Sequence, residues 1–236
     1  MYFGRGIYWG FDWTYLLLVI GMLLSMAASA GVKSTYASYS RVRSRCGLTG
    51  AQVAERILYT AGARDVSVRP VKGSLTDHYD PRTKQVCLSE SVYGSTSLAA
   101  LGVAAHECGH AIQHQKEYLP LTVRSMLVPV ANFGSSLSWP IFLAGLLLQI
   151  SGLLTLGIVL FSLAVLFQLV TLPVEFDASA RALRMLESFG ILGNDETQGA
   201  RKVLRAAALT YVAAVAASVL QLLRLVILAG GRRDRD

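Results

Sequence analysis

The chain has 236 residues, of which 53% are apolar and only 16% are charged. A soluble domain carries about 25% charged residues, so this composition excludes a disordered chain and argues against an ordinary soluble enzyme. The net charge of +7 comes from 22 Lys and Arg against 15 Asp and Glu. In an apolar chain such an excess is typical of cytoplasmic loops, and we expect a membrane protein that binds no nucleic acid.

Four apolar runs lie at about 13–32, 125–146, 152–172 and 206–229. Each is close to the roughly 20 residues that a helix needs to cross the hydrocarbon core. The first run follows an aromatic flank that suits a membrane interface, and this flank lacks the basic residues of a secretory signal peptide. We therefore interpret this run as a retained anchor, with a cleaved signal peptide as the alternative. The second and third runs predict a helical hairpin.

These runs predict a mostly α membrane protein, with about four transmembrane helices and a small α+β unit. The predicted segments are a membrane anchor at 1–32, an α+β unit at 33–121, a transmembrane hairpin at 122–172, a helical segment at 173–205, and a C-terminal transmembrane helix with its tail at 206–236. Basic residues gather in the second and fourth segments, and the positive-inside rule then places both in the cytoplasm. These residues are Lys33, Arg41, Arg43, Arg45, Arg181, Arg184, Arg201, Lys202 and Arg205.

The α+β unit has local signals for two helices and two strands. Thr49 is a suitable N-cap for a helix that ends near Gly62, and the serines and threonine at 95–97 can cap a helix over about 97–116. Alternation of apolar and polar residues predicts strands at 66–71 and 84–89, with a turn-rich loop between them at 73–83.

The second of these helices contains His106-Glu107-Cys108-Gly109-His110, which has the H-E-x-x-H pattern. The two histidines lie one turn apart, so both imidazoles project from one face and can bind a single zinc ion. Glu107 can then act as the general base on a water molecule. The alternative is a pair of helix histidines with an exposed glutamate between them. The chain has only 4 histidines, which makes a chance match improbable.

A catalytic zinc takes three protein ligands, so a third must come from elsewhere. His114 lies about 12 Å from His106 along a straight helix, which is too far for one ion. Glu175 is the best candidate, because two membrane crossings return the chain to the same side. Asp177 is the rival carboxylate, although it has Arg181 four residues on as a natural partner. The alternative for Glu175 is an acid at a helix N-terminus, which Pro173 would open.

Polar residues cluster before the second predicted strand, at Asp77-His78-Tyr79-Asp80. His78 or Tyr79 could donate a hydrogen bond to a developing oxyanion. A turn formed at Asp80-Pro81 explains the acidic residues without any function. The strand at 84–89 could bind an extended peptide by backbone pairing.

These motifs resemble the YugP-type membrane zinc metallopeptidases of bacteria, the neutral zinc metallopeptidase family. The similarity covers nearly the whole chain, and it is carried by DHYDP at 77–81, HECGHAIQ at 106–113 and VEFDASARAL at 174–183. More distantly, the layout is similar to the heat-shock membrane peptidases and the CAAX prenyl endopeptidases. The resemblance implies a gluzincin-like unit in which His106, His110 and Glu175 bind one Zn²⁺ per chain and Glu107 is the base. Ser179 stands where those distant relatives have an Asp that orients a zinc histidine.

The sequence thus predicts a multi-pass membrane protein of the cell membrane that acts as a zinc metalloendopeptidase on peptide or membrane-protein substrates. An intramembrane site-2-type protease is one alternative, although the chain lacks the L-D-G stretch that supplies a ligand in those enzymes. The second alternative is a non-enzymatic membrane adaptor that zinc stabilises.

Overall fold

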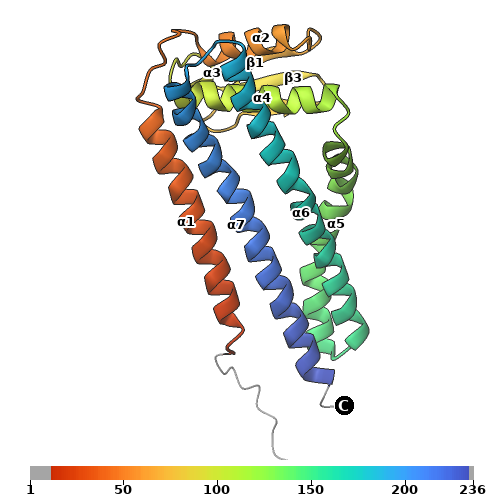
Figure 1. Cartoon of the computed structure of the whole chain (residues 1–236). Coiled ribbons are helices and arrows are strands. Elements are labelled where there is room, and N and C mark those ends of the chain that lie inside the picture. Colours follow the sequence, from red (N-terminus) through yellow and green to blue (C-terminus); the bar gives the residue numbers. More distant parts are fainter. Residues whose placement is uncertain (1–11, 234–236) are drawn as a thin grey trace, which may run out of the picture.

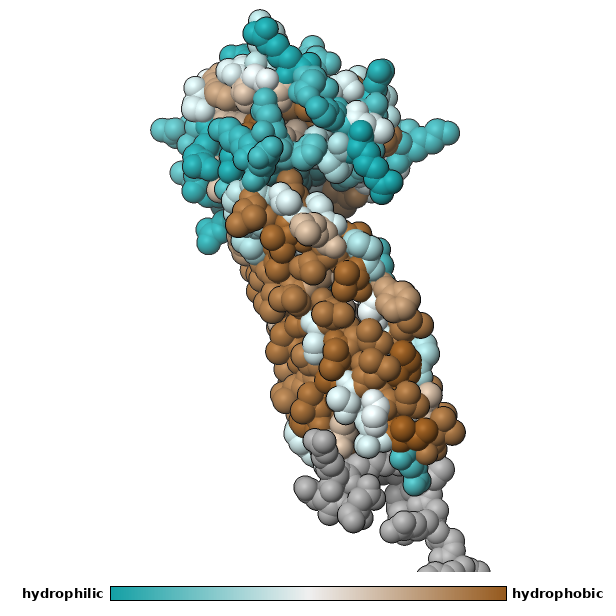
Figure 2. Space-filling view, turned by 90° about the vertical axis from the view of Figure 1, so that its right-hand side faces the viewer, coloured by the Kyte–Doolittle hydropathy of each residue, from teal (hydrophilic) through white to brown (hydrophobic). Residues whose placement is uncertain are grey.

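The computed structural model describes residues 12–233, and its long helices form a bundle beneath a compact head (Figure 1). The four bundle helices are α1 (Tyr15–Tyr39), α5 (Leu119–Leu148), α6 (Ser151–Ser188) and α7 (Asn194–Arg233). All four are long and apolar enough to cross a membrane. Their apolar surface forms a continuous belt below the hydrophilic head (Figure 2). The predicted fold class is therefore confirmed, while the aromatic residues at positions 8, 9 and 11 lie outside the described residues.

The head combines short helices with one three-stranded sheet. Its elements are α2 (Gly50–Thr60), β1 (Ser67–Val71), β2 (His78–Asp80), β3 (Gln85–Ser89), α3 (Glu90–Tyr93) and α4 (Leu98–Gln115). The strand order is β1-β3-β2, with β1 parallel and β2 antiparallel to β3. Helix α4 lies across the upper end of the bundle (Figure 1). The apolar core of the head is formed mainly by α2, β3, α4 and the upper part of α6.

Both predicted N-caps of the head helices are confirmed. The Thr49 side chain accepts a hydrogen bond from the Gln52 backbone, and the Gln52 side chain accepts one from the Thr49 backbone, which completes a capping box. The Ser97 side chain accepts a hydrogen bond from the Ala100 backbone at the start of α4. These local bonds satisfy helix amides that would otherwise lack partners, and they fix where α4 begins.

The structure corrects the expected start of a helix at Pro173. Helix α6 runs without a break from Ser151 to Ser188, with Pro173 in its interior. A proline removes one backbone hydrogen bond, but helices packed among neighbours in a membrane tolerate this loss. The segment expected at 173–205 is consequently shared between the end of α6 and the beginning of α7. Glu175 is then carried on a long rigid helix rather than at a helix terminus.

The region expected to be only a loop, 73–83, also differs from the prediction, because it contains strand β2. β2 pairs with β3, which places β3 in the centre of the sheet with both edges occupied. The free edges for pairing with a peptide therefore belong to β1 and β2 rather than to the strand at 84–89. A three-residue strand has too little sequence pattern to be recognised, and its formation depends on the neighbouring strand.

Candidate metal centre

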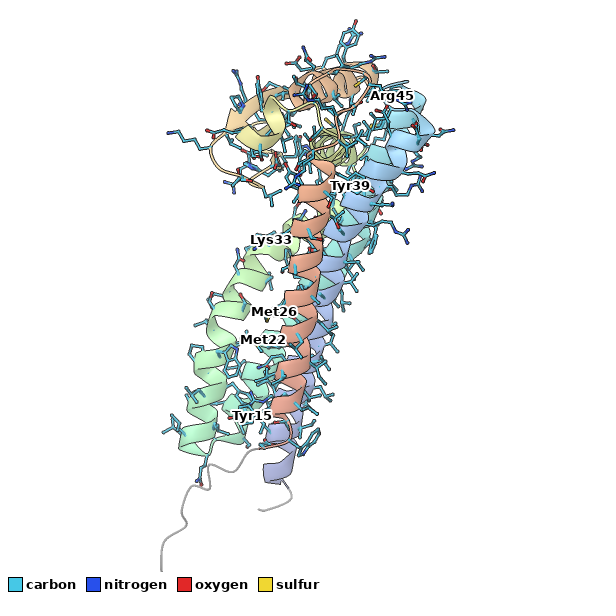
Figure 3. All side chains as sticks on the ribbon, turned by 90° about the vertical axis from the view of Figure 1, so that its left-hand side faces the viewer. Tyr15, Met22, Met26, Lys33, Tyr39 and Arg45 are labelled. Atoms are coloured by element: carbon cyan, nitrogen blue, oxygen red, sulfur yellow. The ribbon has the colours of Figure 1, made fainter. Side chains whose placement is uncertain are left out.

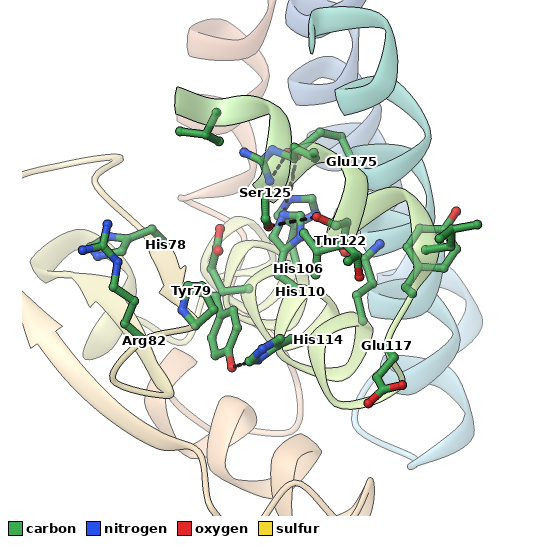
Figure 4. A pocket seen from close by; sticks show the side chains of 18 of the residues that line it. His78, Tyr79, Arg82, His106, His110, His114, Glu117, Thr122, Ser125 and Glu175 are labelled. Carbon is green, nitrogen blue, oxygen red and sulfur yellow. Dashed lines mark hydrogen bonds and ion pairs between the residues drawn. The ribbon is translucent and has the colours of Figure 1, made fainter. Parts of the chain in front are cut away.

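Helices α4 and α6 bring together the two histidines of the H-E-x-x-H motif and one distant carboxylate. Glu175 Oε2 lies 3.4 Å from His106 Nε2 and 3.6 Å from His110 Nε2. One ligand atom from each of the three residues lies within 4.8 Å of the others. The two imidazole rings meet edge to face, with centroids 4.7 Å apart (Figure 4). Two neighbouring histidines and one carboxylate that is distant in sequence thus converge on one point.

This arrangement fits a zinc ion. Bonds of about 2.0–2.1 Å in a tetrahedral site separate ligand atoms by about 3.4 Å, which is close to the spacing of these atoms. Glu175 is only 3% exposed, and its Oε2 atom has no hydrogen-bond partner within residues 12–233. Both imidazole nitrogens lie farther away than the usual N–H···O distance of about 2.9–3.0 Å. A buried, unpaired carboxylate oxygen is costly, and a cation held by both imidazoles removes that cost.

Each histidine is oriented through its other ring nitrogen. His106 Nδ1 lies 3.2 Å from Ser179 Oγ, and His110 Nδ1 lies 3.0 Å from Gln113 Oε1. With acceptors at both Nδ1 atoms, each Nε2 atom is free to bind a metal. Ser179 therefore lies where it can orient His106, with a neutral hydroxyl rather than a carboxylate.

Gln113 is the centre of a buried network that sequence reasoning missed. It is fully buried and donates through Nε2 to the backbone carbonyl of Val174 and to Asp177 Oδ2, each at 2.8 Å. Asp177 also pairs with Arg181, as its spacing predicted. The side chain of Gln113 therefore ties His110 to the turn of α6 that carries Glu175. The only signal for Gln113 in the sequence was its position three residues after His110 of the H-E-x-x-H motif.

A cleft of about 980 Å³ opens in front of the metal centre. Glu107 lines this cleft and is 8% exposed, beside the three convergent side chains but outside their group. Arg124 of α5 and Tyr211 of α7 also line it, and Arg124 lies 3.8 Å from Glu175. Neither residue was singled out from the sequence. The cleft thus offers a carboxylate base, a cation and a phenol around one site.

The predicted oxyanion contacts lie at the other wall of the cleft. His78 is exposed, and its Nδ1 lies 2.9 Å from the backbone carbonyl of Thr76. Tyr79 is hydrogen-bonded to His114, with 2.9 Å between the hydroxyl and Nδ1 (Figure 4). Burial raises the pKa of Tyr79, and the nearby Asp65 and Asp80 charges raise it further, so the phenol stays protonated.

The remaining residue of the motif, Cys108, points away from the metal centre into the core. It is fully buried, and its thiol lies 3.6 Å from the backbone carbonyl of Ala54 in α2. Burial raises the pKa of this thiol far above its usual range, so it remains neutral. Its structural environment is that of a small packing residue.

Comparison with known proteins gives a consistent result. The sequence profile of the family described as "Putative neutral zinc metallopeptidase" matches residues 14–230. The chain is also similar to "Putative membrane protease YugP" of Bacillus subtilis strain 168, with 50% identity over 223 residues. That alignment covers 94% of this chain and 99% of the relative. No solved structure matches the chain significantly.

Proposed function

The chain belongs to the neutral zinc metallopeptidase family, and we propose that it is a membrane-anchored endopeptidase whose active site is the cluster of His106, His110 and Glu175. The observation that carries this proposal is the convergence of these three side chains beside Glu107, at the floor of a large open cleft. Three protein ligands leave one position for water or substrate, as catalytic zinc sites do.

The residues of the chain divide the chemistry between them. When bound, zinc supplies a Lewis acid that polarises the scissile carbonyl and makes water a stronger acid. Glu107 accepts the proton of the attacking water and passes it to the leaving amine, without a covalent intermediate. Arg124 and Tyr211 extend into the cleft near Glu175, where hydrogen-bond donors can stabilise the developing negative charge.

The head also offers a way to bind an extended peptide. β2 is an edge strand, and its residues His78 and Tyr79 line the cleft. A peptide that pairs with the free edge of β2 gains backbone hydrogen bonds that do not depend on its sequence. Such pairing would hold an unfolded segment across the metal centre.

The structural observations favour this function over both alternatives. Helix α4 carries the H-E-x-x-H motif but is not among the four helices that could cross a membrane, which disfavours an intramembrane protease of the site-2 type. A purely structural zinc site has four protein ligands. Within the described residues the cluster contains three, which disfavours an adaptor that binds zinc only for stability.

The experiment that tests the proposal is peptide hydrolysis by the purified Glu107→Gln variant in detergent. We expect turnover to fall by about 10²–10⁴-fold, because the general base is lost while the three zinc ligands remain. Zinc content should be unchanged. Glu55→Gln is a matched control, since Glu55 is exposed on α2 and lies outside the cleft. Undiminished turnover by Glu107→Gln would show that this residue is not the base.

A further inference from the structure

Two cavities lie along α1 and α7, one beside the candidate metal centre and one lower in the bundle, where α5 also lines it. α1 packs against α7 and α5 packs against α6, whereas α1 and α5 stay apart through most of the bundle (Figure 3). The four helices therefore form an open row rather than a closed bundle. We call the space between its two end helices, which contains a cavity that α7 also lines, the groove.

The upper cavity lies directly behind the metal centre. It has a volume of about 160 Å³ and is lined by His106, Glu107 and Glu175. Val32 of α1 and Ala207 of α7 form part of its opposite wall. The proposed reacting groups thus line a cavity that α1 and α7 also line, in addition to the open cleft.

The lower cavity lies within the apolar belt and has a volume of about 260 Å³. It is lined by Ser25 of α1, Trp139 of α5 and Gln221 of α7, among others. Ser25 is seven residues from Val32, and Gln221 is fourteen residues from Ala207. Multiples of seven return to nearly the same face of a helix, so α1 and α7 each present one face to both cavities.

Helix α5 likewise presents one face to both the open cleft and the lower cavity. Val128, which lines the open cleft, and Trp139 are eleven residues apart and share one face. Asn132 and Ser135 lie on this face between them and both are exposed, although the Ser135 hydroxyl donates to the backbone carbonyl of Asn132. Polar side chains at the depth of the hydrocarbon core are expensive unless they meet a polar partner, and they commonly mark substrate pathways.

Gln221 provides the most specific sign of a ligand. It is only 9% exposed, and neither Nε2 nor Oε1 has a hydrogen-bond partner among the described residues. A primary amide offers two donors and one acceptor, which match a peptide backbone or a polar side chain. The acyl chains of lipids cannot satisfy any of these groups. The amide is therefore suited to a polypeptide segment that enters the groove from the bilayer.

We propose that the groove between α1 and α5 binds the transmembrane segment of a membrane-protein substrate, with Gln221 hydrogen-bonded to that segment. This inference rests on the proposed function and names its substrate class. Gln221 lies ten residues below Tyr211, which lines the upper cavity, so the two are about 15 Å apart along α7. The cleaved bond then lies about ten helical residues, or about five extended residues, from the group that Gln221 binds.

The test uses the full chain in lipid nanodiscs and a peptide that the wild-type chain cleaves. The peptide is presented alone, or joined to a leucine-rich transmembrane helix with one Asn about 15 Å from the cleaved bond. We expect Ser25→Trp and Gln221→Leu to lower the ratio of tethered to free peptide turnover at least tenfold. Leu23→Trp places the same side chain on the opposite, exposed face of α1 and should leave this ratio unchanged. An unchanged ratio in both groove variants would overturn the inference.

A cross-linking experiment keeps the inference separate from the proposed function, because it needs no hydrolysis. In the Glu107→Gln background, and with an added thiol oxidant, Ser25→Cys should form a disulfide with a cysteine placed in the transmembrane probe. The yield of cross-linked product with Leu23→Cys should not exceed the background yield that the native cysteines give. Equal yields of cross-linked product with the two variants would overturn the proposal that the groove binds a transmembrane segment, even if the chain cleaves peptides. If Ser25→Cys cross-links selectively but the chain with Glu107 intact cleaves no peptide, the result would support the groove and count against the peptidase.

Discussion

The two histidines of the candidate metal centre differ in what holds them, although both come from one motif. His106 is oriented by the hydroxyl of Ser179, and His110 by the amide of Gln113. Gln113 is also bonded to α6 at Val174 and Asp177. One buried amide therefore fixes both the ring of His110 and its relation to the turn that carries Glu175.

Replacing Gln113 by Leu should weaken zinc binding by about 10–100-fold, because outer partners of zinc histidines contribute about this much to metal affinity. The substitution removes the acceptor of His110 and leaves the Asp177 carboxylate one donor short. Zinc affinity can be measured by competition with a chromophoric chelator. Gln115→Leu is the matched control, because Gln115 is exposed and bonds only to the backbone of Gly62 in the head. Equal zinc affinity in the two variants would contradict this role of Gln113.

Ser179 gives a second prediction at the residue scale. Ser179→Ala should lower zinc affinity by about tenfold, since His106 loses its orienting acceptor. Ser179→Asp should at least retain the wild-type affinity, because a carboxylate is a stronger acceptor than a hydroxyl. The same chelator competition measures both variants, with Ser188→Ala at the exposed end of α6 as the control. If Ser179→Ala binds zinc as the wild type does, the contact with His106 has no role in holding the metal.

At the scale of elements, the crossing of α4 over α6 sets the distance between the histidines and Glu175. Gly109 lies at this crossing, and a Cβ atom added there would lie 2.6 Å from the backbone carbonyl of Ala178. The two backbones can approach so closely only because Gly109 has no side chain. The glycine of the H-E-x-x-H motif is therefore a packing residue of the metal centre.

Gly109→Ala should destabilise the protein by about 1–3 kcal/mol, because the extra methyl group must push α4 and α6 apart. It should also lower zinc affinity, since Glu175 moves away from the histidines. Thermal unfolding followed by circular dichroism in detergent measures the first effect, and chelator competition measures the second. Gly152→Ala in the first turn of α6 is the control, because a Cβ atom there would contact nothing within 4 Å. A variant as stable as the control, with unchanged zinc affinity, would rule out this close crossing.

At the scale of the whole molecule, the head lies at one end of the bundle. Both ends of the described chain lie at the other end (Figure 1). Lys33 lies in the last two turns of α1, and Arg41 and Arg43 follow the end of this helix near the head. Arg181 and Arg184 lie near the end of α6, which also reaches the head. The positive-inside rule then favours a cytoplasmic head.

Impermeant maleimide labelling of intact cells should therefore distinguish the two ends. We expect Trp13→Cys to be labelled from outside, because Trp13 is exposed at the end of the bundle opposite the head. Glu55→Cys on α2 should be labelled only after the membranes are opened. The chain without an added cysteine gives the background from Cys46, Cys87 and Cys108. Labelling of Glu55→Cys in intact cells would place the head outside.

The sequence by itself determined the features that depend on local pattern. Long apolar runs predict membrane helices because the bilayer requires about 20 apolar residues per crossing. The Thr49 and Ser97 caps were predicted because each satisfies backbone groups within three residues. The one-turn spacing in H-E-x-x-H placed His106 and His110 on one face of a helix for the same local reason.

Only the tertiary structure decided which distant groups meet. It carried α6 through Pro173, paired β2 with β3, and placed Gln113 and Ser179 behind the two histidines. It also left α1 and α5 apart and the amide of Gln221 without a partner among the described residues. Contacts between elements depend on the packing of whole helices against one another. Helical periodicity specifies the face on which a residue lies, but it does not specify which neighbour that face meets.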